Sequence, residues 1–142
     1  MLTIPSIVFG EIEVEENLIY SFKQGIPGIR DVRRFVILDM EDNADFKWLQ
    51  ACDPPYLTMM MVDPNIIDPK YNVRLEDSQM KDLELDRPED AFYMAFVVIP
   101  EQPKDMTANL LAPVVFNFKR MVGMQVMING APDLLKVKVF KE

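Results

Sequence analysis

The side chains in this sequence that could carry out acid–base catalysis are mainly carboxylates. Asp53, Asp63 and Asp68 each precede a proline, and Asp105 lies in a later polar loop. If these loops met at one rim of a sheet, two of the groups would form an acid and base pair. A residue before proline is held extended, however, and an Asp side chain bonds its own downstream backbone. We therefore predict strand-end turns here and keep a carboxylate enzyme as the alternative.

The remaining chemical groups are few. The sequence has no histidine, which removes the commonest general base and metal ligand near neutral pH. Cys52 is the only cysteine, so no internal disulfide forms, and after Leu49-Gln50-Ala51 it is expected to pack as a small apolar group. Gly25 and Gly28 flank a proline without an amide hydrogen, which does not suit a phosphate loop. We predict no catalytic residue, no metal and no cofactor.

Charge points to a protein partner instead. The chain carries 15 basic and 23 acidic residues, a formal charge of minus 8. Five basic and two acidic residues give plus 3 over residues 114–142, which leaves minus 11 for residues 1–113. Nucleic-acid binding requires clustered Lys and Arg, so direct binding of RNA or DNA is not expected. A basic partner protein fits this surface better.

The densest acidic stretch is residues 76–90, EDSQMKDLELDRPED. It holds seven acidic residues against two basic ones. Met80 and Leu83 lie three apart, which predicts one short helix on the sheet. We expect Glu76, Asp77 and Asp82 in this stretch to contact a basic partner.

Short apolar runs separated by turn signals predict the fold. Runs of five to nine residues rich in Val, Ile, Phe and Tyr recur along the chain, and no period or linker divides it. This pattern predicts a mostly β protein: one domain over residues 1–142, a small antiparallel β-barrel or sandwich of about nine or ten short strands with one short helix.

Several segments carry more specific predictions. Residues 6–14 and 17–22 are expected to form a hairpin, and the GIPG sequence at 25–28 a type II turn. Residues 91–99 are apolar on both faces, which predicts a central strand. Residues 134–140 alternate apolar residues with lysines, as in a protected edge strand.

The stretch DMTANLLAPVVFNF at 105–118 begins with polar residues before an apolar run. No base is available to activate Thr107, so catalysis there is not expected. We expect Thr107 and Asn109 to bond nearby backbone where a strand begins. Met106, Thr107 and Asn109 are kept as a second candidate group for partner contact.

The N-terminal sequence predicts where the protein resides. It has no basic region followed by an apolar one, and no stretch reaches the roughly 18 apolar residues of a membrane span. We therefore expect an unexported, cytoplasmic protein that does not bind a membrane.

Several motifs, in order along the chain, resemble one family. They are FGEIEV (9–14), GIPG (25–28), WLQACDPP (48–55), VDP (62–64), MTANLLAPVVFN (106–117) and GMQV (123–126). Together they are similar to the flagellar assembly factor FliW family, and MTANLLAP is the most specific of them.

This resemblance implies a mostly β, cytoplasmic bacterial protein without enzymatic activity, monomeric when free. Members of the family bind flagellin before its export and bind the translational regulator CsrA, whose repression of flagellin mRNA they relieve. Residues 76–90 would then contact CsrA, and exposed methionines and aromatics would contact flagellin. A carboxylate enzyme or small-ligand barrel and a purely structural subunit stay as the alternatives.

Overall fold

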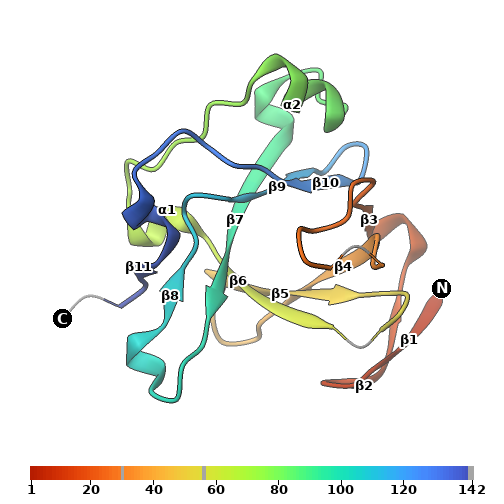
Figure 1. The fold of residues 1–142 in the computed structure, drawn as a ribbon. Coiled ribbons are helices and arrows are strands. Elements are labelled where there is room, and N and C mark those ends of the chain that lie inside the picture. Colours follow the sequence, from red (N-terminus) through yellow and green to blue (C-terminus); the bar gives the residue numbers. More distant parts are fainter. Residues whose placement is uncertain (30, 56, 141–142) are drawn as a thin grey trace.

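The chain is built almost entirely of short strands (Figure 1). The computed structural model describes residues 1–29, 31–55 and 57–140. Within them lie two α-helices, α1 (Pro64–Ile67) and α2 (Asp77–Asp82). The eleven strands of these residues are β1 (Leu2–Ser6), β2 (Gly10–Val14), β3 (Ile19–Ser21), β4 (Arg34–Asp39), β5 (Phe46–Ala51), β6 (Thr58–Val62), β7 (Ala91–Val98), β8 (Thr107–Ala108), β9 (Val114–Asn117), β10 (Val122–Gln125) and β11 (Val137–Lys138). The predicted mostly β fold is confirmed, with one helix more than expected and slightly more strands.

Seven of the strands close into a barrel. They follow the order β7, β6, β5, β4, β3, β10 and β9, and β9 returns to pair with β7. The neighbours run antiparallel except β3 and β10, which meet in parallel at Ser21 and Val122. β8 and β11 extend the sheet beside the end of β7, whereas β1 and β2 form a separate hairpin. Closure leaves most strand edges paired, which protects them from adding foreign strands.

The barrel interior is filled by the inward-facing residues of these strands. Leu49 of β5, Met61 of β6 and Phe116 of β9 are fully buried there. Tyr20 and Phe22 pack their rings edge-on against Phe116, with ring centres 5.0 and 5.9 Å away. Burying each large apolar side chain contributes about 1.5–3 kcal/mol, so this cluster supplies much of the stability.

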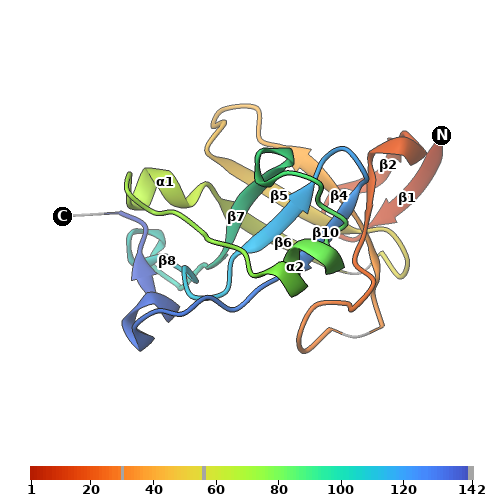
Figure 2. The same ribbon diagram turned by 90° about the horizontal axis from the view of Figure 1, so that it is seen from above.

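Three smaller apolar clusters lie on the outer faces of the barrel. The β1–β2 hairpin covers Val36 and Cys52 with Ile4 and Val14. The second cluster joins β5, β6 and β7 to α1 and to the C-terminal segment, and the third joins β9 and β10 to the α2 region. Figures 1 and 2 show the hairpin, α1 and α2 on three different sides. Much of the outer surface of the barrel is thereby covered.

The N-terminal hairpin differs from the predicted one. β1 pairs with β2 in full register from Leu2–Val14 to Ser6–Gly10, and residues 7–9 form the turn. Residues 17–22 contribute β3, which pairs with β4 and β10, so the predicted hairpin of 6–14 with 17–22 was wrong. Tyr20 of β3 packs in the barrel interior, which only a barrel strand reaches.

Other local predictions are confirmed. In GIPG the Ile29 N–H donates to the Ile26 carbonyl at 2.8 Å, and Gly28 has φ +87°, as a type II turn requires. β7 is central, with β6 along one edge and β8 and β9 along the other. β11 lies at the sheet edge as predicted, but it is only two residues long because residues 132–135 form a 3-10 turn.

Both α-helices are short, and one was not predicted. α2 lies in the stretch where a helix was expected. In α1, Pro64 occupies the first turn and the Asp63 Oδ1 accepts from the Asn65 N–H at 2.9 Å. These are favourable N-terminal features, but the helix has only four residues and therefore little periodicity. Across the described ranges, no helix is long and apolar enough to cross a membrane.

Candidate functional site

The predicted acidic residues Glu76 and Asp77 lie at the start of α2, beside an open pocket of about 560 Å³. One wall is the segment 72–79 and the other is the segment 127–129. The Glu76 N–H donates to the Gln79 Oε1 at 2.9 Å, which satisfies a backbone donor where the helix begins. Leu75 and Ile128 pack into the apolar cluster beneath. The polar surface of the pocket is therefore supported by a packed apolar cluster.

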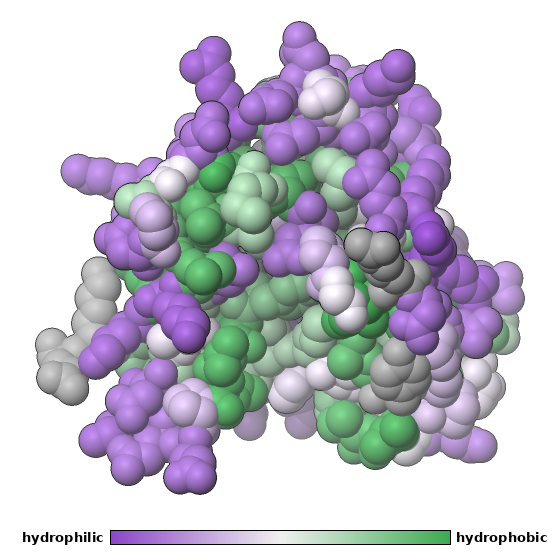
Figure 3. Space-filling view, viewed as in Figure 1, coloured by the Kyte–Doolittle hydropathy of each residue, from purple (hydrophilic) through white to green (hydrophobic). Residues whose placement is uncertain are grey.

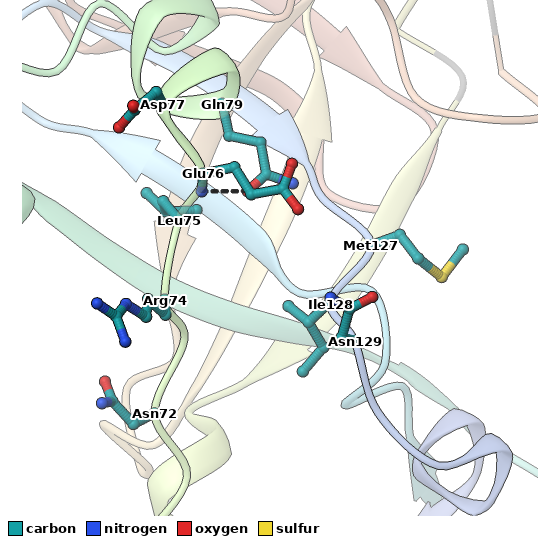
Figure 4. A pocket seen from close by; sticks show the side chains of 9 residues that line it. All are labelled: Asn72, Arg74, Leu75, Glu76, Asp77, Gln79, Met127, Ile128 and Asn129. Atoms are coloured by element: carbon teal, nitrogen blue, oxygen red, sulfur yellow. Dashed lines mark hydrogen bonds between the residues drawn. The ribbon is translucent and has the colours of Figure 1, made fainter.

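Side-chain directions at this pocket separate the two carboxylates. In Figure 4 the Glu76 side chain extends across the pocket toward the wall that carries Met127, whereas Asp77 points away from it. Arg74 also points outward, and Met127 is 68% exposed. Glu76 and Asp77 thus offer charge on both sides of the helix start.

The charges of residues 76–90 divide into paired and unpaired groups. Arg120 reaches Glu84 and Asp86, at 3.9 and 3.3 Å, and Lys119 reaches Asp90 at 3.2 Å. Lys23 also pairs with Glu84, and this hydrogen bond and charge lower the pKa of the Glu84 carboxyl.

By contrast, no ion pair within the described ranges reaches Glu76, Asp77 or Asp82. Asp82 accepts only from the amide of Gln24, at 3.3 Å. Among the described residues, the three acidic residues singled out from the sequence therefore have no cation as a partner. We call the surface of Glu76, Asp77 and Asp82 the α2 face.

Asn117, which the sequence did not single out, fixes the end of α2 to the barrel. It is buried, and its Nδ2 donates to the carbonyls of Leu83 at 2.8 Å and Glu84 at 3.1 Å. Its Oδ1 accepts from the backbone N–H groups of Lys119 and Arg120. The only sequence signal was a lone amide in the apolar run Val114–Phe118.

Met106, Thr107 and Asn109 lie away from the α2 face and belong to the scaffold. Met106 is buried in the cluster beneath α1, and Thr107 pairs within the sheet with Val98 and Lys138. The Asn109 Oδ1 accepts from the N–H groups of Leu111 and Ala112 at 3.1 and 3.0 Å, at the bend between β8 and β9. The predicted backbone role of Asn109 is confirmed, while partner contact by this group stays a prediction.

Two of the four carboxylates considered for catalysis bind backbone N–H groups. Asp63 caps α1, and the Asp68 Oδ1 accepts from the Lys70 N–H at 3.0 Å. Cys52 is buried, and burial raises the pKa of its thiol to about 11. Among the residues that the structure describes, no cluster of three or more His, Cys, Asp or Glu is arranged to hold a metal ion.

A second surface, rich in apolar residues, surrounds Trp48. Two hollows share this side chain, one of about 540 Å³ and one of about 440 Å³. We call their apolar lining the Trp48 groove; it includes Phe9, Leu38, Met40, Trp48, Met60 and Ile99. In Figure 3, hydrophobic residues flank a hollow in the lower part of the molecule, beside the end of β7 and beside the hairpin. The sequence analysis missed this groove.

Gln50 supports the groove from beside Trp48, because the two residues lie on the same face of β5. It is fully buried, and its Oε1 accepts from the hydroxyls of Ser6 at 2.8 Å and Thr58 at 2.6 Å. Its Nε2 donates to the carbonyls of Ala51, Pro55 and Leu57. One side chain thereby ties the hairpin to β5 and β6.

Comparison with known proteins places the chain in one family. The family model described as FliW protein matches residues 3–139. A "Flagellar assembly factor FliW" from Caldicellulosiruptor saccharolyticus is 36% identical over 136 residues, covering 96% of this chain and 89% of the relative. One from Bdellovibrio bacteriovorus is 35% identical over 132 residues, covering 93% of this chain and 75% of the relative.

A comparison with solved structures gives the same family. The crystal structure of a flagellar assembly factor FliW superposes with a TM-score of 0.90 at 31% identity, covering 99% of this chain and 98% of that one. The two chains therefore share the same overall fold. The chain belongs to the FliW protein family.

Proposed function

We propose that this protein is a cytoplasmic, non-enzymatic flagellar assembly factor that binds flagellin before export and binds the translational regulator CsrA. Family membership supports the assembly role, because the relatives carry that name. The two partners and the lack of enzymatic activity are inferred from the family resemblance of the sequence motifs. Whichever partner is in excess would occupy the protein, so that flagellin translation follows the amount of unexported flagellin.

The observation that carries the proposal is the unpaired charge of the α2 face. CsrA acts on mRNA, and a protein that binds RNA contacts the phosphates with Lys and Arg, so we expect the RNA-binding surface of CsrA to be basic. Glu76, Asp77 and Asp82 are exposed, and in the described ranges no ion pair neutralises their charge, as complementary docking requires. We propose that CsrA docks on this face.

Charge reversal tests this assignment. Changing Glu76, Asp77 and Asp82 together to Lys should weaken CsrA binding about 10- to 100-fold at low salt, since each exposed pair contributes about 0.2–1 kcal/mol and its reversal adds repulsion. Titration calorimetry with purified CsrA at two salt concentrations measures the loss and the change in salt dependence.

A matched control reverses three exposed carboxylates outside residues 76–90: Glu101, Asp105 and Asp133. This variant has the same net charge, so a general effect of charge would weaken CsrA binding equally in both proteins. Equal losses, or an unchanged affinity of the first variant at low salt, would remove the α2 face as the docking site. Co-purification with flagellin, tested in parallel, shows whether flagellin is a partner as well.

A further inference from the structure

The floor of the Trp48 groove is a row of side chains that crosses the strands. Leu38 of β4 lies opposite Trp48 of β5, and Trp48 lies opposite Met60 of β6. Paired strands lie about 4.8 Å apart, so these side chains follow one another at about that interval. The row continues toward β7, because Val97 and Ile99 line the same hollow as Met60.

The pairing of the floor strands decides which kind of chain fits. β4 is paired on both edges, with β3 and β5, and β5 with β4 and β6. Along β4 and β5 an extended peptide therefore finds no free backbone edge on which to add a strand. β6 pairs with β7 only at Met61 and Val62, so within the described ranges the edge open to a strand at this floor is limited to Thr58–Met60. A helix needs none, and its turns repeat every 5.4 Å, close to the interval of the row, whereas same-face residues of a strand repeat at about 6.8 Å.

The sides of the groove are apolar and exposed. Phe9 packs edge-on against Trp48, with ring centres 5.6 Å apart, and is still 40% exposed. Next to it, Ile7 and Val8 at the hairpin turn are 74% and 57% exposed, and Ile99 on the opposite side is 49% exposed. A tryptophan set among exposed apolar side chains is the arrangement in which binding energy concentrates at protein interfaces.

One rim of the groove carries unbalanced negative charge. Asp39, Glu41 and Asp42 line the larger hollow. Lys47 pairs with Asp39 at 2.6 Å, but no ion pair among the described residues reaches Glu41 or Asp42. A partner with Lys or Arg beside its apolar face would match this rim.

We propose that the Trp48 groove binds an amphipathic α-helix of about three turns, which is the length needed to cross β4 to β7 at about 4.8 Å per strand. The apolar face of the helix lies along Leu38, Trp48 and Met60, and its basic residues lie beside Glu41 and Asp42. The inference rests on the proposed function only in that this protein works by holding other proteins. It assigns a second docking surface, separate from the α2 face.

Trp48 reports the binding directly, because it is the only tryptophan of the chain. The probe is a 14-residue synthetic peptide with Leu along one helical face and Lys elsewhere. Titration into the full chain should shift the Trp48 fluorescence to shorter wavelength and saturate. The same composition rearranged to alternate Leu and Lys, and a Leu and Glu helix, should bind at least tenfold more weakly.

Matched variants locate the site, with a fluorescein-labelled peptide as the second readout. Changing Glu41 and Asp42 to Lys should weaken binding of the Leu and Lys peptide at least tenfold. Changing Asp105 and Asp133 to Lys should alter its affinity less than twofold, because these two residues are exposed and line neither hollow. Equal binding of the rearranged peptide, or equal losses in both variants, would overturn the proposal in favour of general charge attraction.

The same experiment separates this inference from the proposed function. The titration contains neither flagellin nor CsrA. If the peptide does not bind, the groove proposal is wrong, but the proposed binding of flagellin and CsrA is unaffected. Conversely, saturable peptide binding by a protein that captures neither partner would reject the proposed function and keep the groove.

Discussion

The α2 face and the Trp48 groove lie on the outside of the same barrel, yet they present opposite chemistry. The α2 face offers three carboxylates that no ion pair among the described residues reaches, and two of them lie beside an open polar pocket. The Trp48 groove offers an aromatic floor with charge on one rim only. Charged surfaces chiefly steer and select partners, whereas desolvated aromatic surfaces hold them. One small barrel thus has two surfaces suited to two different partners.

Each surface depends on one buried amide. Asn117 ties the end of α2 to the barrel, and Gln50 ties the hairpin to the strands below the groove. Both amides are almost fully buried, and each bonds groups from two or more segments. The two surfaces are therefore supported separately, and this separation leads to the predictions below.

Removing either amide should have the largest effect. Replacing Gln50 or Asn117 by Leu leaves several buried polar groups without partners, and each substitution should lower the free energy of unfolding by about 3 kcal/mol. Urea unfolding measures the loss.

Hydrogen exchange then shows where each loss acts. With Gln50→Leu, protection should fall mainly over residues 2–14 and 57–58, because these segments lose hydrogen bonds to the Gln50 side chain. With Asn117→Leu it should fall mainly over residues 77–85 and 118–121, which lose their hydrogen bonds to Asn117. If both variants lost protection evenly over the whole chain, the separation of the two supports would be wrong.

A smaller effect is expected at the bend between β8 and β9. Asn109→Ala removes the acceptor for two backbone N–H groups and should cost about 1–2 kcal/mol of stability. Affinity for CsrA and for the helical peptide should stay unchanged, since Asn109 belongs to neither surface. Lost binding with full stability would instead make Asn109 a third contact site.

The smallest effect concerns alkaline pH. Burial holds the pKa of Cys52 at about 11, above the ordinary value of 9.0. Between these values the unfolded chain releases a proton that the folded chain keeps, so stability should fall as pH rises from 9 to 11. Cys52 lies beneath the hairpin, and so the groove side should loosen first.

Cys52→Ala provides the comparison for this pH effect. Urea unfolding of both proteins at pH 8 and pH 10.5 should show that the wild type loses about 1 kcal/mol more than the variant. Identical pH dependence of the two proteins would mean that the thiol does not contribute.

Local sequence patterns predicted much of this architecture, whereas the pairing of strands far apart in the sequence could not be predicted from them. An apolar run on both faces of residues 91–99 was enough to predict a central strand, because β7 packs into the barrel interior on one face and into outer clusters on the other. The partner of β3 depended on how the barrel closes, which no local pattern contains. α1 was too short to show a period.

The candidate site divides in the same way. Clustering of charge along residues 76–90 indicated the α2 face, but which carboxylates stay unpaired depends on Lys23, Lys119 and Arg120, far away in sequence. Trp48 follows Lys47 in a strand whose other face is buried, so alternation marks it only as outward-facing. Its exposure depends on where the hairpin, α1 and the C-terminal segment leave the barrel uncovered.

CsrA affinity in two variants shows whether the two surfaces act separately. Calorimetric titration of CsrA should show a loss of about 10- to 100-fold when Glu76, Asp77 and Asp82 are reversed to Lys, but less than twofold for Trp48→Ala. The opposite result, with CsrA binding lost in Trp48→Ala and retained after charge reversal at low salt, would mean that CsrA docks on the Trp48 groove and not on the α2 face.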